Sequence, residues 1–600
     1  MLAPDQSLDL ARLRAAYHAR TLRPLEVVEG VLERIARRGN DKVWIHKVPH
    51  AALTEQARRL EDQSPDRLPL YGVPFAIKDN IDLAGHPTTA ACPEFAYTPR
   101  ASATVVQRLV DAGALPIGKT NLDQFATGLV GTRTPYGACR NVFDPEYIVG
   151  GSSSGSAVAV SAGLVSFALG TDTAGSGRVP AAFNNIVGLK PTRGLLSTRG
   201  VVPACRSLDV VSIFTLTVAD GLDVLAVAQG FDGADPFSRE ATARAVPNLE
   251  QFNYGVPAAR DLEFFGDKEA ARLFAAFLKK LEELGGTEVE VDFRPFLETA
   301  RLLYEGPWVA ERYWAVRELI ERHPEALHPV TREVIARGAK ASAVEAFDAY
   351  YRLKALRRVT AAAWKEIDFL ALPTAGTIYR ITEVEADPIR LNSNLGHYTN
   401  FVNLLDLAGI AVPAGFRADG LPFGATLLAP AFQEGALGAL GMRIQQAFAL
   451  PLGATGIAPP DTEFREVAPS RAGTVRLAVC GAHMAGLPLN RELVERGARL
   501  LREARTAPRY RFFALESFSP PRPGLVRAEP GNAIAVEVWE VPAEELGSFV
   551  DGIPAPLGIG TLELEDGEEV HGFLCEQYAT AGAREISELG GWRAYLATRR

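Results

Sequence analysis

The chain has 600 residues, more than one ordinary hydrophobic core organises, so we expect one large domain and at least one smaller one. Hydrophobic residues make up 47% and charged residues 22%, values typical of globular proteins, which excludes a mainly disordered chain. The net charge is −9 and no long basic stretch occurs, so a nucleic-acid partner is not expected.

The N-terminal residues 1–7 lead directly into charged helical sequence and lack the pattern of a signal peptide, so export is not predicted. Five scattered cysteines, an odd number without close pairs, favour reduced thiols in a cytoplasm and form no zinc motif. The longest low-charge stretch, Ser156 to Gly170, is shorter than the roughly 20 apolar residues of a bilayer span. We interpret it as a buried helix entering a strand and expect no membrane partner.

Two helices are predicted at the start of the chain, from Leu8 to Ala19 and from Pro24 to Arg38, with Ser7 and Thr21 as N-caps. From Tyr71 to Asp209, short apolar runs broken by Gly, Pro and Asn alternate with helical stretches. This alternation indicates an α/β domain in which helices cover a sheet.

Later segments predict an insertion and a second domain. Residues 262–365 have a helical pattern and could form an insertion that covers a site, before strand-like runs return at 369–373 and 410–416. We place a linker at 461–474, between a large domain at 1–460 and an α+β module at 475–600. Within the module, the predicted strands are 474–480, 510–515, 533–538, 560–564 and 570–575, and the predicted helices are 491–504 and 543–550.

Two glycine- and serine-rich segments, 150–156 and 170–178, follow a lysine in the apolar run 73–80. A serine hydroxyl is a weak nucleophile and needs an adjacent base, which is usually histidine. No histidine lies between His86 and His323, whereas burial of Lys78 in its apolar run would favour a neutral amine. The pattern therefore indicates a serine hydrolase whose base is lysine.

The spacing of Ser152 and Ser176, with Gly-Leu-Lys-Pro-Thr at 188–192, resembles the amidase signature family, whose fold is a mixed sheet covered by helices. The resemblance implies a Ser-cis-Ser-Lys triad in which Ser176 is the nucleophile, Ser152 relays the proton and Lys78 is the base. It also implies a cis peptide at Gly151-Ser152. The expected oxyanion donors are backbone amides in the small-residue run before the nucleophile. These residues are Thr173, Ala174 and Gly175.

Two further segments, Asn-Asn-Ile-Val-Gly at 184–188 and the run at 303–313, are similar to allophanate hydrolases of that family. Allophanate is a urea-type amide that carries a carboxylate, which a guanidinium can hold with two parallel hydrogen bonds. The resemblance implies Arg312 and Tyr304 as substrate-binding residues and Gly128 as a backbone contact.

The C-terminal module resembles the γ-glutamylcyclotransferase-like domain that allophanate hydrolases carry. The resemblance links it to decarboxylation of the first product, with His483 as the matching histidine, or else to stability or assembly. The implied reaction converts allophanate to ammonia and N-carboxycarbamate, which then loses carbon dioxide. No metal, nucleotide or organic cofactor is expected, and a homodimer or higher homo-oligomer is favoured.

Several alternatives remain open at this point. Residues 113–120 fit the P-loop expression of a nucleotide-dependent enzyme, but Gly113 ends a helical run instead of following a strand. Residues 151–155 fit a nucleophile elbow with Ser153 as nucleophile and a base such as His397, although no apolar strand precedes them. A broad-specificity amidase is the nearest competing function, and a non-enzymatic binding or assembly protein is another.

Overall fold

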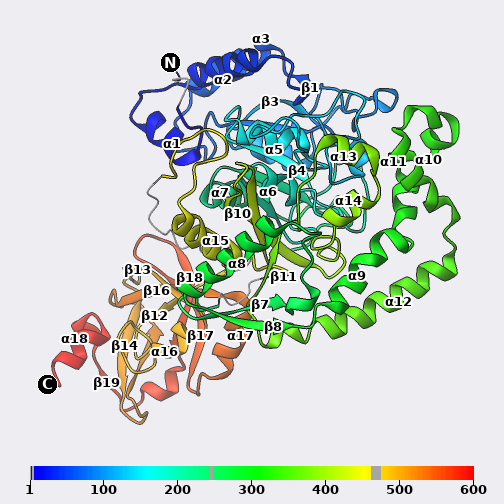
Figure 1. Cartoon of the computed structure of the whole chain (residues 1–600). Coiled ribbons are helices and arrows are strands. Elements are labelled where there is room, and N and C mark those ends of the chain that lie inside the picture. Colours follow the sequence, from blue (N-terminus) through cyan, green and yellow to red (C-terminus); the bar gives the residue numbers. More distant parts are fainter. Residues whose placement is uncertain (1, 3–5, 243–246, 461–473, 600) are drawn as a thin grey trace. The chain divides into compact units, whose positions relative to one another are not determined.

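The computed structural model describes residues 2, 6–242, 247–460 and 474–599. The chain divides into two compact units, residues 1–470 and 471–600 (Figure 1). The predicted linker at 461–474 lies outside the described residues except for Thr474, which begins a strand of the second unit.

The larger unit is built on an eleven-stranded mixed sheet with the strand order β1-β3-β2-β4-β6-β5-β10-β11-β9-β7-β8. The interior strand β2 pairs in parallel with both β3 and β4, whereas β10 pairs antiparallel with β5 and β11. The predicted mixed α/β sheet is thus confirmed. Its strands are β1 (Trp44–Lys47), β2 (Pro74–Lys78), β3 (Leu115–Thr120), β4 (Phe167–Thr171), β5 (Val187–Lys190), β6 (Val211–Thr215), β7 (Phe252–Pro257), β8 (Gly286–Val291), β9 (Phe369–Pro373), β10 (Leu407–Phe416) and β11 (Pro422–Pro430).

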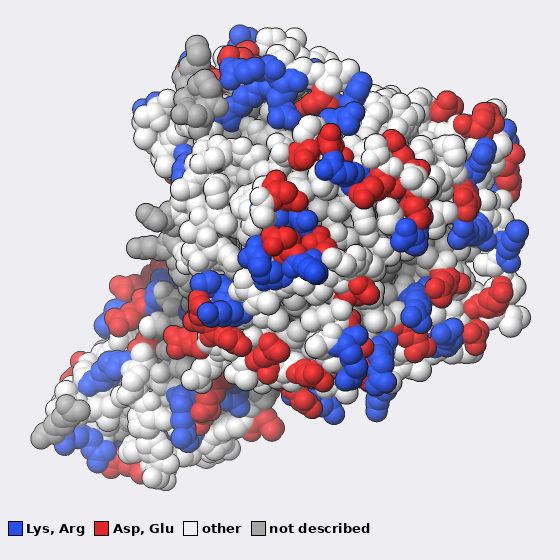
Figure 2. Space-filling model, viewed as in Figure 1, with Lys and Arg blue, Asp and Glu red and all other residues white. Residues whose placement is uncertain are grey.

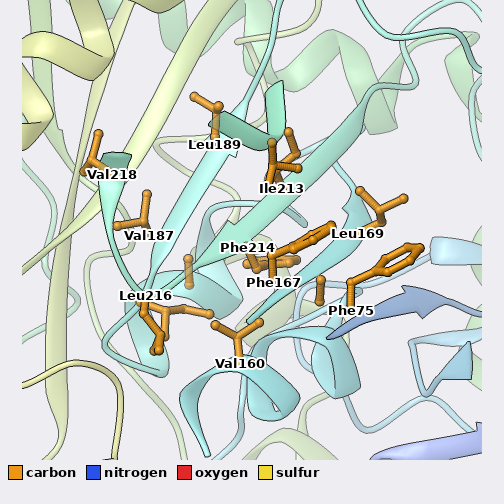
Figure 3. Close-up of a cluster of buried hydrophobic side chains, with 14 of the residues drawn as sticks. Phe75, Val160, Phe167, Leu169, Val187, Leu189, Ile213, Phe214, Leu216 and Val218 are labelled. Carbon is orange, nitrogen blue, oxygen red and sulfur yellow. The ribbon is translucent and has the colours of Figure 1, made fainter. Parts of the chain in front are cut away.

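Apolar side chains from neighbouring strands form the core of this unit (Figure 3). Phe75 of β2 stands opposite Phe167 of β4, and their rings stack with centroids 5.0 Å apart. Strands buried on both faces read as continuous apolar runs, as they do here. The core fixes the ends of β2 and β4, where the polar site begins.

Fifteen α-helices are described in the larger unit. The N-terminal helices occur where the sequence predicts them, but their caps differ: the Asp9 carboxylate accepts from the N–H of Arg12, and Arg23 precedes the second helix. Ser7 and Thr21 are therefore not the caps. The helices are α1 (Leu10–His18), α2 (Pro24–Arg38), α3 (His50–Glu61), α4 (Thr104–Asp111), α5 (Ser154–Ser161), α6 (Val179–Phe183), α7 (Val218–Ala228), α8 (Lys268–Glu283), α9 (Arg294–Glu305), α10 (Trp308–Arg322), α11 (Pro329–Ala336), α12 (Ala343–Thr360), α13 (Ile381–Ala386), α14 (Arg390–Leu395) and α15 (Glu434–Phe448).

The block predicted to be helical at 262–365 contains one strand. Gly285, with φ at +94°, follows α8, and residues 286–291 then form β8 beside β7. The alternation of Thr and Val with Glu in this segment is the strand pattern that the helical prediction overlooked. The remaining helices α9 to α12 lie together at the right of the unit in Figure 1.

The smaller unit combines a five-stranded sheet, in the order β13-β16-β12-β18-β17, with a three-stranded sheet, β15-β14-β19, so the predicted α+β class is confirmed. One prediction is wrong: the helix expected at 491–504 ends at Val494, and β13 begins at Arg499 after Gly497, whose φ is +67°. Its elements are β12 (Thr474–Val479), α16 (Arg491–Val494), β13 (Arg499–Arg505), β14 (Tyr510–Leu515), β15 (Arg522–Arg527), β16 (Ala535–Pro542), α17 (Ala543–Asp551), β17 (Leu557–Glu563), β18 (Glu569–Cys575), β19 (Arg584–Glu585) and α18 (Trp592–Ala597).

The charges on the visible surface are mixed in sign, and the described helices are not of the membrane-spanning kind. On the face shown in Figure 2, lysine and arginine side chains are interspersed with aspartate and glutamate. Every described helix is too short or too polar to cross a lipid bilayer.

Candidate active site

Lys78 is the last residue of β2, and its side chain is fully buried. Its Nζ donates hydrogen bonds to the Oγ of Ser152 and to the Oγ1 of Thr171, both at 2.7 Å. Burial lowers the pKa of the Lys78 amine to about 7, although nearby buried acids oppose the shift. Near neutral pH, a large fraction of this amine is therefore uncharged and able to accept a proton.

The parallel pairing of β2 with β4 brings these groups together. Lys78 ends β2 and Thr171 ends β4, and the carboxyl ends of parallel strands lie at the same edge of a sheet. Ser152 stands two residues before α5, which packs against both strands. Three segments that are distant in the sequence thus meet at one edge.

Ser152 follows a cis peptide bond from Gly151. The Ser152 carbonyl accepts from the N–H of Asp123, and the Asp123 carboxylate accepts from the N–H groups of Gly131 and Arg133 at 3.0 and 2.9 Å. A Cβ atom on Gly151 would lie 2.1 Å from Asp123 Oδ2. This close approach explains why glycine is required before the serine.

Ser153, the nucleophile of the alternative elbow reading, has a different environment. Its hydroxyl donates to the backbone carbonyl of Thr171 at 3.2 Å, and no described histidine contacts it. His397, the base considered for that reading, packs against the rings of Phe265 and Tyr398. The elbow interpretation is therefore not supported by the described contacts.

A buried ion pair shapes the loop that carries Ser176. The Asp172 carboxylate accepts from Arg178 Nε at 2.9 Å and from the N–H groups of Gly175 and Gly177 at 2.9 and 3.0 Å. Both charged side chains are fully buried, so each depends on the other for charge compensation. The pair holds the loop between β4 and α6 in one conformation.

Ser176 is buried, and its Oγ donates to the carbonyl oxygen of Gly128 at 3.5 Å, a long hydrogen bond. Among the described contacts, none joins the Ser176 hydroxyl to Ser152. Gly128 itself is tightly enclosed, because a Cβ atom there would lie 2.6 Å from Asp123 Oδ2. The structure thus brings Gly128 beside Ser176 and Ser152 beside Lys78.

The three residues expected to donate to an oxyanion differ in their availability. The N–H of Gly175 already donates to Asp172, so this amide is occupied. For the N–H groups of Thr173, Ala174 and Ser176, no acceptor is found among the described residues. The Gly175 amide is therefore part of the loop's internal hydrogen bonding.

Arg312 of α10 is buried, with 2% of its surface exposed. Its Nη1 donates to Thr127 Oγ1 at 3.1 Å, and its Nη2 to the hydroxyl of Tyr304 of α9 at 3.4 Å. No described carboxylate forms an ion pair with it. Thr127 precedes Gly128, which contacts Ser176, so the guanidinium lies near the candidate nucleophile.

Several supporting residues were missed by the sequence reasoning. The Thr399 hydroxyl donates to the carbonyl of Ala174 at 2.6 Å, and the Asn403 amide donates to the carbonyl of Asp172 at 2.6 Å. The Asp209 carboxylate accepts from Thr173 Oγ1 at 2.5 Å. Since Thr399 and Asn403 lie more than 200 residues beyond the loop, no local pattern could have indicated them.

The P-loop expression at 113–120 falls on β3 instead of on a loop that opens a helix. Its Lys119 is fully buried and pairs with Asp79 at 3.1 Å. This segment therefore belongs to the structural framework.

The second unit holds the remaining predicted residue, His483, in the loop after β12. Its Nε2 lies 3.1 Å from the Glu492 carboxylate, and its ring stacks on Phe573 with centroids 5.1 Å apart. Burial lowers the pKa of His483, while Glu492 acts in the opposite direction. The result is a mostly neutral, oriented imidazole near neutral pH.

Comparison with known proteins agrees with this geometry. Residues 26–437 match the amidase family, and residues 475–597 match the allophanate hydrolase C-terminal domain. Urea amidolyases from Lachancea kluyveri and Saccharomyces cerevisiae are 44% and 42% identical over 93% and 95% of the chain. The chain spans only 31% and 32% of the length of those relatives.

A solved structure of Kluyveromyces lactis allophanate hydrolase is 40% identical, with a TM-score of 0.78 and 99% of each chain covered. The similarity to this structure extends over both units of the chain, whereas the amidase match covers the larger one. Together with the buried Lys78–Ser152 pair, these matches establish that the chain belongs to the amidase family.

Proposed function

We propose that the chain hydrolyses the terminal amide of allophanate to ammonia and N-carboxycarbamate. The observation that carries the proposal is the buried amine of Lys78, with a pKa of about 7, in contact with Ser152 at 2.7 Å. The similarity to K. lactis allophanate hydrolase supports this substrate over other amides.

In the proposed mechanism, the neutral Lys78 amine takes a proton from Ser152 as Ser152 takes one from Ser176. For this step the Ser176 hydroxyl leaves its long contact with the Gly128 carbonyl and donates to Ser152. Its oxygen then attacks the carbonyl carbon of the terminal amide. The relay thereby forms an Oγ–C bond while the proton ends on the Lys78 amine.

The tetrahedral intermediate places negative charge on the former carbonyl oxygen. The free N–H groups of Thr173, Ala174 and Ser176 are the proposed donors to it, and removing one such donor in other enzymes costs about 2.7–4 kcal/mol. The C–N bond then breaks, and the proton returns through Ser152 to the leaving ammonia. Water, activated by the same relay, hydrolyses the ester on Ser176 and releases N-carboxycarbamate.

Recognition of the substrate carboxylate is assigned to Arg312 and Tyr304. The Arg312 guanidinium is buried without a described carboxylate partner, a costly state that an anionic substrate would relieve. The Tyr304 hydroxyl accepts a hydrogen bond from Arg312 Nη2 and so fixes one side of the guanidinium group. Gly128 contributes a carbonyl beside the nucleophile.

We further propose that His483 promotes loss of carbon dioxide from N-carboxycarbamate within the second unit. The support is its contact with Glu492 and its stacking on Phe573, which orient the ring. For the chain as a whole, we propose a catalytic domain at 1–460, a linker at 461–474 and a C-terminal domain at 475–600. A cytoplasmic homo-oligomer that uses no cofactor completes this proposal.

The test is ammonia release from purified protein supplied with allophanate. We expect steady release from the wild type, and a loss of at least about 10³-fold in Ser176→Ala because the covalent route is gone. Ser153→Ala, which alters the neighbouring serine, is expected to retain the reaction. Full activity of Ser176→Ala would reject the mechanism, and faster turnover of uncharged amides than of allophanate would favour the broad-specificity alternative.

A further inference from the structure

A cavity of about 530 Å³ lies in the larger unit, apart from the triad. It is lined by the start of α10, one face of α12 and residues of two loops, among them Arg193, Trp308, Tyr350, Leu353 and Arg357. None of the triad residues lines it, so a molecule held there would be bound and not turned over.

Positive charge dominates the lining of this cavity. Arg357 donates through Nε to the carbonyl of Leu404 at 2.8 Å, and no described carboxylate pairs with it. Arg193 shares Asp406 with Arg239, at 3.2 and 2.8 Å. One carboxylate thus serves two guanidinium groups, and a third guanidinium beside them has none.

The two remaining charged groups of the lining are a lysine, which adds positive charge, and one acid. Lys354 has no described ion-pair partner and stands 5.3 Å from the ring centroid of Tyr350. Glu311, the acid in the described lining, is engaged by Ser207, whose N–H donates to it at 2.8 Å and whose hydroxyl donates at 2.5 Å. The pKa of Arg357 is lowered by burial and then by the positive charge of Arg193, as expected where cations gather.

Most of the remaining lining is apolar. Trp308, Leu353 and Leu208 contribute to the wall, together with Pro307 and four alanines. An inorganic anion would satisfy the guanidinium groups but leave this wall in contact with water. A ligand that fits both parts has one anionic group and a hydrocarbon or aromatic body.

We propose that this cavity binds an organic carboxylate with an apolar body, whose carboxylate is held by Arg357 with help from Lys354. Guanidinium suits a carboxylate because its planar fork can donate two parallel hydrogen bonds. This inference goes beyond the hydrolysis of allophanate, which is too small and polar to cover the apolar wall.

The test uses 8-anilinonaphthalene-1-sulfonate, a fluorescent anion with an aromatic body, as the probe on the full chain. We expect one saturable site, displaced by octanoate and not by inorganic phosphate. Arg357→Gln should weaken probe binding by about tenfold or more, because a charge-assisted contact is lost. Arg358→Gln, a matched change on the exposed side of α12, should leave binding unchanged.

Two further variants keep the test decisive if Arg357→Gln is unstable. Ala346→Phe fills the cavity without removing charge and should abolish probe binding, whereas Arg357→Lys should retain part of it. Equal binding by the wild type, Arg357→Gln and Ala346→Phe would overturn the proposal, as would displacement by phosphate alone. Ammonia release from allophanate, measured on the same samples, separates this outcome from failure of the proposed function.

Discussion

The surroundings of Lys78 and of His483 show two ways in which a protein prepares a base. Each residue lies at or just beyond the carboxyl end of a strand inside its sheet, β2 in the larger unit and β12 in the smaller. The pKa of Lys78 falls from 10.5 to about 7 through complete burial. An imidazole already titrates near neutral pH, so His483 needs only orientation, which Glu492 and Phe573 supply.

This difference explains why the groups around Lys78 are more completely buried than those around His483. A lysine becomes a useful base only where water is excluded and its hydrogen-bond partners are fixed, so Ser152 and Thr171 are fully or almost fully buried. A histidine tolerates a more open setting, and Glu492 is itself partly exposed. Substitutions should therefore be far more damaging around Lys78 than around His483.

The largest loss of activity is expected from Lys78→Met, which removes the amine but keeps an apolar chain. We expect kcat/KM for ammonia release to fall about 10³- to 10⁴-fold, because the general base is lost. In the wild type, kcat/KM should rise with pH through about 7, since the amine must be neutral to accept a proton and is an ammonium at lower pH. The pH profile of ammonia release measures both effects.

Lys190→Met is the matched control for this prediction. Lys190 is also fully buried, with a pKa lowered to about 7 by burial, but its Nζ donates to the carbonyl of Pro191 and contacts no serine. The variant should keep the wild-type pH profile in whatever activity remains. A flattened profile in Lys190→Met, or an unchanged one in Lys78→Met, would contradict the assignment of the base.

Arg312→Gln tests substrate selection in the same unit. We expect kcat/KM for allophanate to drop by about 10²-fold, because the buried charge opposite the substrate carboxylate is lost. Hydrolysis of an uncharged small amide should change little. Steady-state kinetics with both substrates gives the ratio, and an equal loss for both would show that Arg312 supports the fold instead of reading the carboxylate.

A smaller effect is expected from Gly175→Ala. The φ of Gly175 is +130°, and a Cβ there would lie 2.4 Å from Thr399 Oγ1. We expect the free energy of unfolding to fall by about 1–3 kcal/mol and kcat to fall about tenfold, as the loop that carries Ser176 shifts. Gly435→Ala, at a helical glycine with open space around it, should not destabilise the protein in the same denaturant titration.

How much of the site could be predicted from the sequence depends on whether a residue lies in a local motif or reaches the site only through the fold. Lys78, Ser152 and Ser176 lie in local patterns of glycine, serine and apolar residues, so a motif could indicate them. Thr399 and Asn403, which donate hydrogen bonds to the loop that carries Ser176, reach it through the fold alone. The occupied amide of Gly175 was missed for the same reason, because its acceptor is set by the loop's conformation.

Helices and strands were predicted correctly where the spacing of their apolar residues was clear over many residues. Pro24 to Arg38 was predicted with its observed bounds because its apolar face repeats with helical spacing. The segment 286–291 was misread, since five or six residues of alternating Val and Glu are a weak signal inside a long helical block. In the smaller unit, the helix expected at 491–504 failed at Gly497, which favours the left-handed conformation that ends a helix.

The smallest effect should come from His483→Gln, which keeps a hydrogen-bonding side chain but cannot take up a proton. Ammonia release should equal that of the wild type, because this step belongs to Lys78 and the serines. Release of carbon dioxide should slow by less than about tenfold, since the carbamate product also decomposes without a catalyst and general acid–base help adds only part of the rate. Following ammonia and carbon dioxide in one reaction separates the two steps.

His571→Gln, on β18 of the same unit, is the control and should change neither rate. If His483→Gln slowed ammonia and carbon dioxide equally, the imidazole would act on the first reaction or on the stability of the protein, and the division of the two steps between the two units would fail.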